Sequence, residues 1–176
     1  MCPHGLGTCG DNSNPSSGGN TNPVHTTRNI TLNISTTNNN LVSGSPFSGQ
    51  VSYVPSSQNF QGTISVPNLS PGQYLVNVKM DGFLGKQIPT VISVIQGKQV
   101  DLPELYVTTG DINNDNQLDI EDYNILISCY GSKYTTSSCL APATSKSPGA
   151  DIDDDGSVNG SDYNLFLREL SVQKGG

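Results

Sequence analysis

The 176-residue chain contains no tryptophan, few charged residues and no long apolar run. Charged side chains make up only 13% of it, and the eight Lys and Arg residues form no patch, so nucleic acid is not an expected partner. No segment approaches the roughly 18 consecutive apolar residues that cross a membrane, so no membrane span is expected. The first residues lack the basic and apolar regions of a signal peptide, and we expect any export signal to lie outside this sequence.

Catalytic motifs are lacking as well. The sequence has no P-loop, no nucleophile elbow and no HExxH motif, and without tryptophan it has no such platform for a sugar. Acidic pairs that would suit acid–base chemistry all fall within two loops near the C-terminus, where a bound cation would occupy them. We therefore predict that the chain is not an enzyme.

The four cysteines occur as two close pairs, Cys2 with Cys9 and Cys129 with Cys139. Neither pair has CxxC or zinc-knuckle spacing, which leaves two local disulfides or four free thiols in a reducing compartment. Low charge and abundant Asn, Ser, Thr and Gly favour disulfides and an extracellular location.

The N-terminal segment, residues 1–28, is dominated by Asn, Ser, Gly, Pro and Thr. Because it has too few apolar side chains to offset the entropy of ordering, it is predicted to be a flexible linker when alone. Residues 24–27 precede the first expected strand, and an extended segment of this kind can add a strand to the sheet edge of a neighbouring molecule.

Residues 29–108 contain several short runs in which apolar and polar residues alternate. The period of two appears at residues 30–34, 51–53, 64–66 and 74–78, and turn residues separate the runs. About seven short strands of this type fit a small antiparallel β-sandwich.

Two stretches in this region carry a resemblance to a known family. They are LSPGQY at residues 69–74 and VKMDGF at residues 78–83, followed by expected strands before Gly97 and over residues 102–107. This pattern resembles the carboxypeptidase regulatory-like (transthyretin-like) β-sandwich. The resemblance implies a spacer or a structural partner for an adjoining module, and it carries no catalytic residues into this chain.

The C-terminal third of the chain is an internal repeat at an offset of 40 residues (111 to 151). DINND at residues 111–115 pairs with DIDDD at 151–155, and DYN at 122–124 pairs with DYN at 162–164. Ten of the fifteen acidic residues fall in loop one (residues 111–122) and loop two (residues 151–162). Local acidity of this kind attracts hard cations.

Both loops have oxygen-bearing side chains at positions one, three, five, nine and twelve, and position seven offers a backbone carbonyl. A twelve-residue EF-hand loop uses these positions to give Ca²⁺ its roughly six to eight oxygen ligands. We therefore predict two Ca²⁺ ions, one for each loop. The predicted ligands are Asp111, Asn113, Asp115, Gln117, Asp119 and Asp122 in loop one, and Asp151, Asp153, Asp155, Ser157, Asn159 and Asp162 in loop two.

Two features depart from the EF-hand pattern. Position twelve is Asp instead of Glu, which shortens the reach of the expected bidentate ligand. Position six is Gly156 in loop two but Asn116 in loop one, and Asn tolerates the left-handed backbone that this turn requires.

Each loop is predicted to lead into one amphipathic helix. Apolar residues follow the loops at helical spacing, namely Tyr123, Leu126, Ile127 and Tyr130, and then Tyr163, Phe166, Leu167 and Leu170. No helical pattern precedes either loop, since residues 102–109 are typical of strand and turn and residues 140–150 are rich in Pro, Ser and Thr. Paired calcium loops with only the exiting helix resemble the dockerin family, over residues 110–170.

The resemblance to dockerins implies binding to a cohesin domain and attachment to an extracellular assembly. In that family the contacts come from loop positions ten and eleven and from helix residues further on. The corresponding residues are Ile120, Glu121, Ile127 and Ser128 in the first repeat, and Gly160, Ser161, Leu167 and Arg168 in the second. Because the two sets differ, binding in two equivalent orientations is not expected.

The sequence therefore predicts an α+β chain that resembles an X-module–dockerin pair. Its parts are the N-terminal segment (residues 1–28), a small antiparallel β-sandwich (29–108) and a two-helix calcium domain (109–172). The predicted function is calcium-stabilised attachment to a cohesin-like partner. The alternative is a structural subunit that assembles with copies of itself into an extracellular filament or surface layer, through its N-terminal segment.

Overall fold

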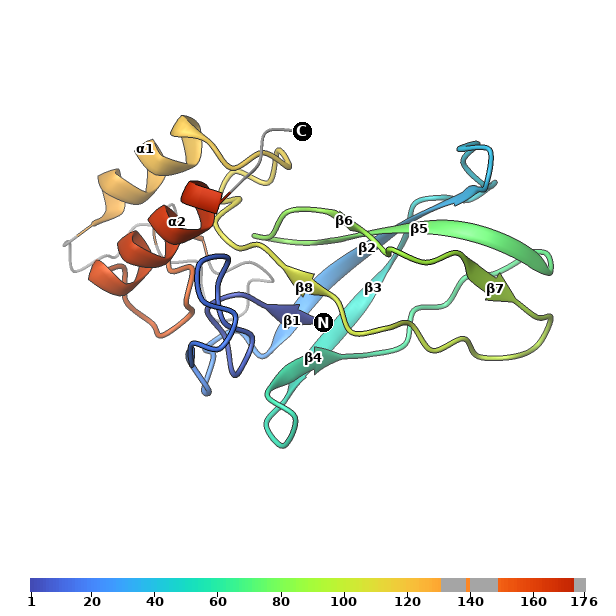
Figure 1. Cartoon of the computed structure of the whole chain (residues 1–176), viewed down its shortest axis with the longest axis horizontal. Coiled ribbons are helices and arrows are strands. Elements are labelled where there is room, and N and C mark those ends of the chain that lie inside the picture. The colour runs from blue at the N-terminus through green and yellow to red at the C-terminus, as the bar shows by residue number, and fades with distance from the viewer. Residues whose placement is uncertain (131–138, 140–148, 173–176) are drawn as a thin grey trace.

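The computed structural model describes residues 1–130, 139 and 149–172. It is α+β, as the sequence predicts: a mostly antiparallel β region is followed by two helices (Figure 1). Among the described residues, no helix has both the length and the apolar character needed to cross a bilayer.

Six strands form one curled antiparallel sheet. They are β2 (Thr27–Thr36), β3 (Phe47–Val54), β4 (Asn59–Gln61), β5 (Gly72–Met80), β6 (Lys86–Gln87) and β7 (Ile92–Val94). The strand order is β4-β3-β2-β5-β6, and β7 also pairs with β5. In the centre of the sheet, Ile30 of β2 lies opposite Gly49 of β3 and Met80 of β5.

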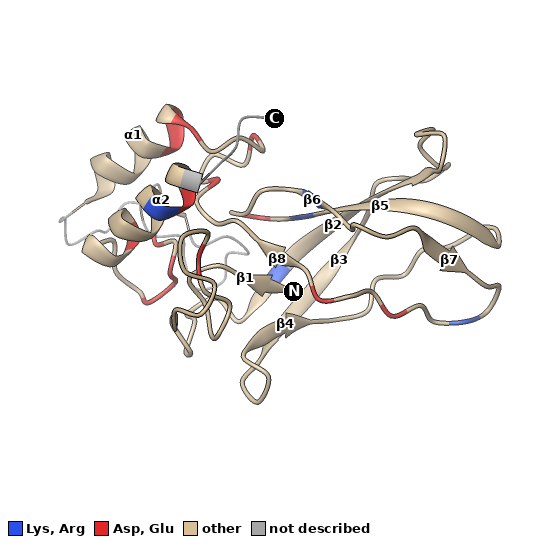
Figure 2. Cartoon of the chain, in the orientation of Figure 1, with Lys and Arg blue, Asp and Glu red and all other residues tan. Residues whose placement is uncertain are grey.

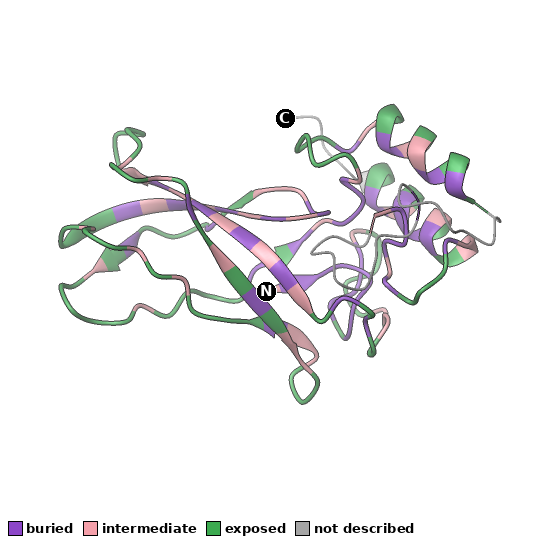
Figure 3. Ribbon diagram, turned by 180° about the vertical axis from the view of Figure 1, so that it is seen from behind, coloured by how far each residue is buried: buried purple, intermediate pink, exposed green. Residues whose placement is uncertain are grey.

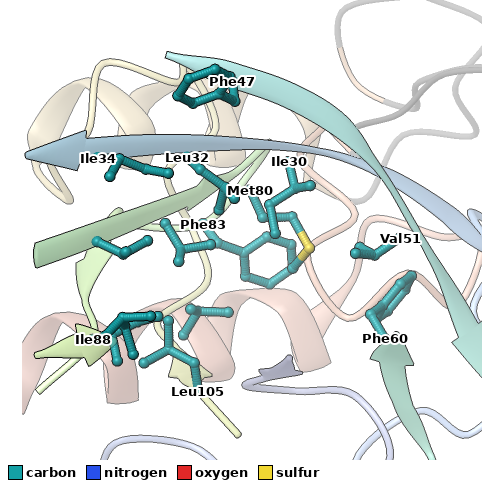
Figure 4. Packing of buried hydrophobic residues seen from close by; sticks show 14 of the residues in the cluster. Ile30, Leu32, Ile34, Phe47, Val51, Phe60, Met80, Phe83, Ile88 and Leu105 are labelled. Atoms are coloured by element: carbon teal, nitrogen blue, oxygen red, sulfur yellow. The ribbon is translucent and has the colours of Figure 1, made fainter. Parts of the chain in front are cut away.

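Alternation along the strands builds the larger of two apolar cores. Ile30, Leu32 and Ile34 are buried while the residues between them are only half buried, which gives the banded pattern of Figure 3. They pack with apolar residues of β3, β4 and β5, including Val51, Phe60 and Met80 (Figure 4). Ile64 and Val66 are half buried beside this core, but they belong to no strand, in contrast to the prediction.

A second, two-stranded sheet joins the beginning of the chain to the strand before loop one. β1 (Cys2–Pro3) runs parallel to β8 (Tyr106–Val107). Met1 also exchanges backbone hydrogen bonds with Phe60 of β4, at 2.8 and 2.9 Å. The sequence did not predict this pairing, because β1 lies in a segment that is too polar to indicate a strand.

The N-terminal segment is folded onto the rest of the chain and is not the expected linker. A disulfide joins Cys2 to Cys9, and Leu6 between them is fully buried in the larger core. Gly5 and Gly7, on either side of Leu6, have φ values of 84° and 55°, which bend the backbone in a way that other residues rarely accept. The disulfide and these turns lower the entropic cost of ordering a polar segment.

The two helices lie side by side and build the second core. Helix α1 (Ile120–Cys129) follows loop one, and α2 (Gly160–Val172) follows loop two. Tyr123 of α1 contacts Tyr163 and Phe166 of α2, with ring centres 6.4 and 6.2 Å apart. A disulfide between Cys129 and Cys139 closes the end of α1. The predicted absence of a helix before loop two concerns residues 140–150, of which 140–148 lie outside the described residues.

Candidate metal centre

Loop one is held together by its own acidic side chains. Asp122, at position twelve, reaches back and accepts from the amides of Ile112 and Asn113 at 2.7 and 3.2 Å. Asp119 caps α1 by accepting from the amide of Glu121 at 2.8 Å, and its own amide donates to Asp122 at 3.1 Å. This capping box starts the helix where the loop ends, so the loop and the helix form one unit.

Loop two repeats this arrangement. Asp162 accepts from the amides of Asp153 and Asn159 at 3.1 and 2.9 Å. The two oxygens of Asp151, at position one, accept from the amides of Asp155 and Gly156 at 3.0 and 2.9 Å. Similar bonds in both loops indicate that the repeat in the sequence is also a repeat in structure.

Left-handed residues give both loops the same path. Position four is Asn114 or Asp154, with φ values of 63° and 56°, and position six is Asn116 or Gly156, with φ values of 69° and 95°. The sequence prediction that Asn116 takes the backbone of a glycine is confirmed. Asn and Asp are the residues other than Gly that adopt this conformation most readily.

Three carboxylates of loop two converge. Asp151, Asp153 and Asp155 can each place one oxygen within 4.8 Å of the other two. Burial raises the pKa of Asp151 to about 8 and that of Asp153 to about 7, and in both cases the charge of Asp162 adds to the effect. Burial also raises the pKa of Asp162 and, in loop one, that of Asp122. Without a cation, the fold therefore disfavours the ionised form of these side chains.

This donor set fits a hard divalent cation. Its side-chain donors are carboxylate and amide oxygens without sulfur or imidazole, which suits Ca²⁺ better than zinc or copper. In loop one, Oδ1 of the fully buried Asp111 has no hydrogen-bond partner within the described part of the chain. Among the described residues, three acids converge in this way only in loop two, because loop one has Asn113 where loop two has Asp153.

Loop one is attached to the sheet by the connection between β5 and β6. The amides of Gly82 and Gly85 donate to the side chains of Asn114 and Asn116, at 2.7 and 2.6 Å. These two asparagines occupy the left-handed positions of the loop, so they are fixed by their backbone as well as by their side chains. Lys79, near the end of β5, also forms an ion pair with Asp111.

Loop two is attached to the N-terminal segment through Asp154. This carboxylate is fully buried and accepts from the amide of His25 at 2.9 Å and from Nη2 of Arg28 at 2.7 Å. Nδ1 of His25 lies 2.5 Å from its other oxygen. The side-chain amide of Asn20 donates to the carbonyls of Asp153 and Asp154 at 3.0 and 2.6 Å. Asp154, at position four, therefore attaches loop two to the N-terminal segment, and it is not one of the predicted ligands.

The N-terminal segment also covers part of α2. Glu169 is fully buried, lies 3.0 Å from Nδ1 of His4 and accepts from the amide of Asn12 at 3.1 Å.

A second contact between this segment and α2 is an ion pair, in which Nε of Arg168 donates to Asp11 at 2.7 Å. Although burial opposes ionisation of Asp11, hydrogen bonds from Ser13, Asn14 and Arg168 lower its pKa to about 2.

The residues predicted to meet a partner lie on both helices, with unequal access. In the first repeat Ile120, Glu121, Ile127 and Ser128 are all exposed. In the second repeat Ser161 and Leu167 are exposed, whereas Gly160 is half buried and Arg168 is held by Asp11. The acidic residues gather on the loops and helix ends, and few lie on the sheet (Figure 2).

Several residues of the site were not predicted from the sequence. They are Lys79 on the sheet, Asp154 and Glu169 in the second repeat, and His4, Asp11, Asn20, His25 and Arg28 in the N-terminal segment. One signal was present: Asp154 is an acid at a loop position that supplies no ligand. Both histidines of the chain lie in a segment that otherwise resembles a linker.

No protein-family model matches the chain, and a comparison with curated proteins gives no match. Two crystal structures of a type II cohesin–X-dockerin complex from Acetivibrio cellulolyticus are similar in fold. An N-terminal interface mutant of that complex has a TM-score of 0.50, and a C-terminal interface mutant has 0.47. Each match is 19% identical and covers 81% of this chain and 80% of the other. At this identity the likeness concerns the fold alone, which is X-module- and dockerin-like.

Proposed function

We propose that this chain is a non-catalytic extracellular module that binds calcium and attaches to a cohesin-like domain of another protein. The observation that carries the proposal is the pair of loop–helix units, packed on each other through Tyr123, Tyr163 and Phe166. The fold-level likeness to an X-dockerin structure, which covers 81% of this chain, supports the same proposal.

Calcium is the proposed cofactor, with one ion in each loop and the ligands predicted from the sequence. The raised pKa values of Asp151 and Asp153 support this, because burial disfavours their ionised form unless a positive charge lies beside them. A bound cation would supply this charge and hold each loop in its present shape. The loops then serve as structural clamps, since their helices already pack together.

The proposed binding surface is centred on α1. Ile120 and Ile127 have 65% and 41% of their surface exposed, and Tyr130 at the end of the helix is also exposed. Exposed apolar residues that cluster on one helix are typical of a protein-binding surface. Leu167 and Leu170 of α2 are exposed as well, but the N-terminal segment holds Arg168 beside them.

The division of the chain is part of the proposal. Residues 29–108 would form the supporting β module and residues 109–172 the calcium module, with residues 1–28 joining them. The Cys2–Cys9 and Cys129–Cys139 disulfides support an oxidising, extracellular location.

Self-assembly through the N-terminal segment has less support. Residues 24–27, which could add a strand to a neighbour, are used within the chain: the amide of Val24 donates to Asp154, and Thr27 begins β2. A heterologous partner is therefore the preferred reading.

Binding to a panel of cohesin domains tests the proposal. The panel includes the type II cohesin of the Acetivibrio cellulolyticus complex, and binding is measured by biolayer interferometry with calcium or with EDTA. We expect capture by at least one cohesin in calcium and loss of capture in EDTA. If no cohesin is captured and light scattering shows large calcium-dependent assemblies, the self-assembly alternative is correct instead.

A matched pair of double variants locates the surface. Ile120→Asp with Ile127→Asp places charges on α1, and each change at a buried hot spot costs about 2 kcal/mol or more. The control, Ile95→Asp with Val91→Asp, alters two residues that flank β7 and are 65% and 47% exposed. We expect at least a hundredfold loss of affinity for the first pair and less than threefold for the control. Equal losses would show that the surface lies elsewhere.

A further inference from the structure

Lys79 is a positive charge directed at the first calcium loop. It lies near the C-terminal end of β5, and Nζ donates to the carbonyl of Phe83 at 2.6 Å and to Oδ2 of Asp111. Its side chain is only 19% exposed. The hydrogen bond to the Phe83 carbonyl holds the ammonium group of Lys79 in place beside Asp111.

The two carboxylate oxygens of Asp111 have different surroundings. Oδ2 accepts from Lys79 and from the amide of Asn116, the latter at 3.1 Å. Oδ1 is buried, and no described residue offers it a hydrogen bond. A buried carboxylate oxygen without a partner is costly, which marks Oδ1 as the atom available to a cation. Lys79 therefore neutralises the first ligand of the loop without covering the oxygen that would bind the ion.

In the part of the chain that the structure describes, loop two has no equivalent of Lys79 on its first ligand. Among the described residues, no Lys or Arg forms an ion pair with Asp151. Arg28 lies nearby, but its ion pair is with Asp154, whose negative charge offsets it. The ligand sets themselves carry equal charge, with four carboxylates each: Asp111, Asp115, Asp119 and Asp122 against Asp151, Asp153, Asp155 and Asp162.

We propose that Lys79 makes the two calcium sites unequal, so that loop two binds Ca²⁺ tightly and loop one binds it at least tenfold more weakly. The inference rests on the calcium role proposed above and adds the residue that sets the difference. An ammonium and an ion on the two oxygens of one carboxylate are roughly 5 Å apart. Even with the screening of bulk water, repulsion at that distance weakens binding of a divalent ion by about tenfold.

Calcium titration of the full chain by isothermal calorimetry, with a competing chelator, measures both constants. The wild type is expected to show two classes of site that differ at least tenfold. Lys79→Met should tighten the weaker class by about tenfold and leave the tighter one unchanged. Lys86→Met is the matched control, because it removes the same charge from an exposed strand residue whose Nζ donates to Tyr106. It should change neither constant by more than twofold.

A second variant assigns the sites without relying on the fold of Lys79→Met. Asp151→Asn disables loop two, and the site that remains should have the weaker constant of the wild type. Two equal sites in the wild type, a tight site remaining in Asp151→Asn, or no difference between Lys79→Met and Lys86→Met would each overturn the inference alone. If no calcium binds to any form of the chain, the proposed calcium role fails together with it.

Discussion

The buried pair of Arg28 and Asp154 offers the sharpest test of how the N-terminal segment holds loop two. Replacing Asp154 by Asn removes the charge but keeps the size and the readiness for a left-handed backbone, since φ is 56° at this position. The side-chain carbonyl of Asn can still accept from the amide of His25. What is lost is the negative charge facing Arg28.

The expected cost follows from the burial of Arg28. Its guanidinium is fully buried, and desolvation already lowers its pKa. Within the described residues Nε and Nη1 have no hydrogen-bond partner, so Asp154 is the ion-pair partner of this guanidinium, and the centre of the Phe60 ring lies 5.5 Å from Cζ. Asp151 and Asp81 add a weaker electrostatic effect. Removing one partner of such a pair costs about 3 kcal/mol or more. For a chain of this size that lowers the midpoint of thermal unfolding by roughly 6–12 °C.

Urea unfolding and calorimetry of Asp154→Asn in saturating calcium measure this cost. Asp101→Asn is the matched control, because it removes the same charge from an exposed residue whose contact is the side chain of Gln99 at 3.3 Å. The double variant Arg28→Met with Asp154→Asn should recover at least half of the loss, about 1.5 kcal/mol. Together with Arg28→Met alone it completes the double-mutant cycle, in which we expect a coupling energy of about 2 kcal/mol. A coupling below about 0.5 kcal/mol, or a loss no larger than in Asp101→Asn, would refute the reasoning.

Three further predictions concern calcium, pH and the first disulfide. Excess EDTA should lower the midpoint measured by calorimetry, because an ion at a hundred times its Kd adds about 2.7 kcal/mol; an unchanged melt would exclude binding. In EDTA, the free energy of unfolding measured in urea should fall as pH rises from about 4 to about 8. In the folded chain Asp151 and Asp153, with pKa values of about 8 and 7, keep protons that the unfolded chain releases over this range. Greater stability at pH 8 than at pH 5 would contradict this. Cys2→Ser with Cys9→Ser should cost about 2.5 kcal/mol in the same assay, and a loss below about 0.5 kcal/mol would mean that the segment folds without its disulfide.

The features that the sequence predicted are those with local, repeated signals. The period of two around Ile30 and the helical spacing after each loop depend on neighbouring residues, and the 40-residue repeat doubles every signal in the C-terminal third. The α+β class and the two helices could be inferred for this reason. The run from Ile64 to Val66 shows the limit, because the alternation matches the half-buried side chains but did not reveal that these residues lie outside the strands.

The N-terminal segment could not be predicted because its partners are distant and polar. His4 pairs with Glu169 across 165 positions, and His25 pairs with Asp154 across 129. Such pairs leave no periodicity in the sequence, and each member looks like an ordinary surface residue until the fold buries it. The composition of the segment shows that it has few apolar side chains. It does not show the disulfide and the buried ion pairs that compensate for this lack.

The two loop–helix units are joined to the rest of the fold at two separate places, loop one at the connection between β5 and β6 and loop two at the N-terminal segment. Two attachments restrict rotation of the helices relative to the sheet more than one attachment would. Any protein bound to α1 would therefore have a fixed orientation relative to the long strands. The direction in which the rest of an assembly extends would be decided by this joint and not by a flexible tether.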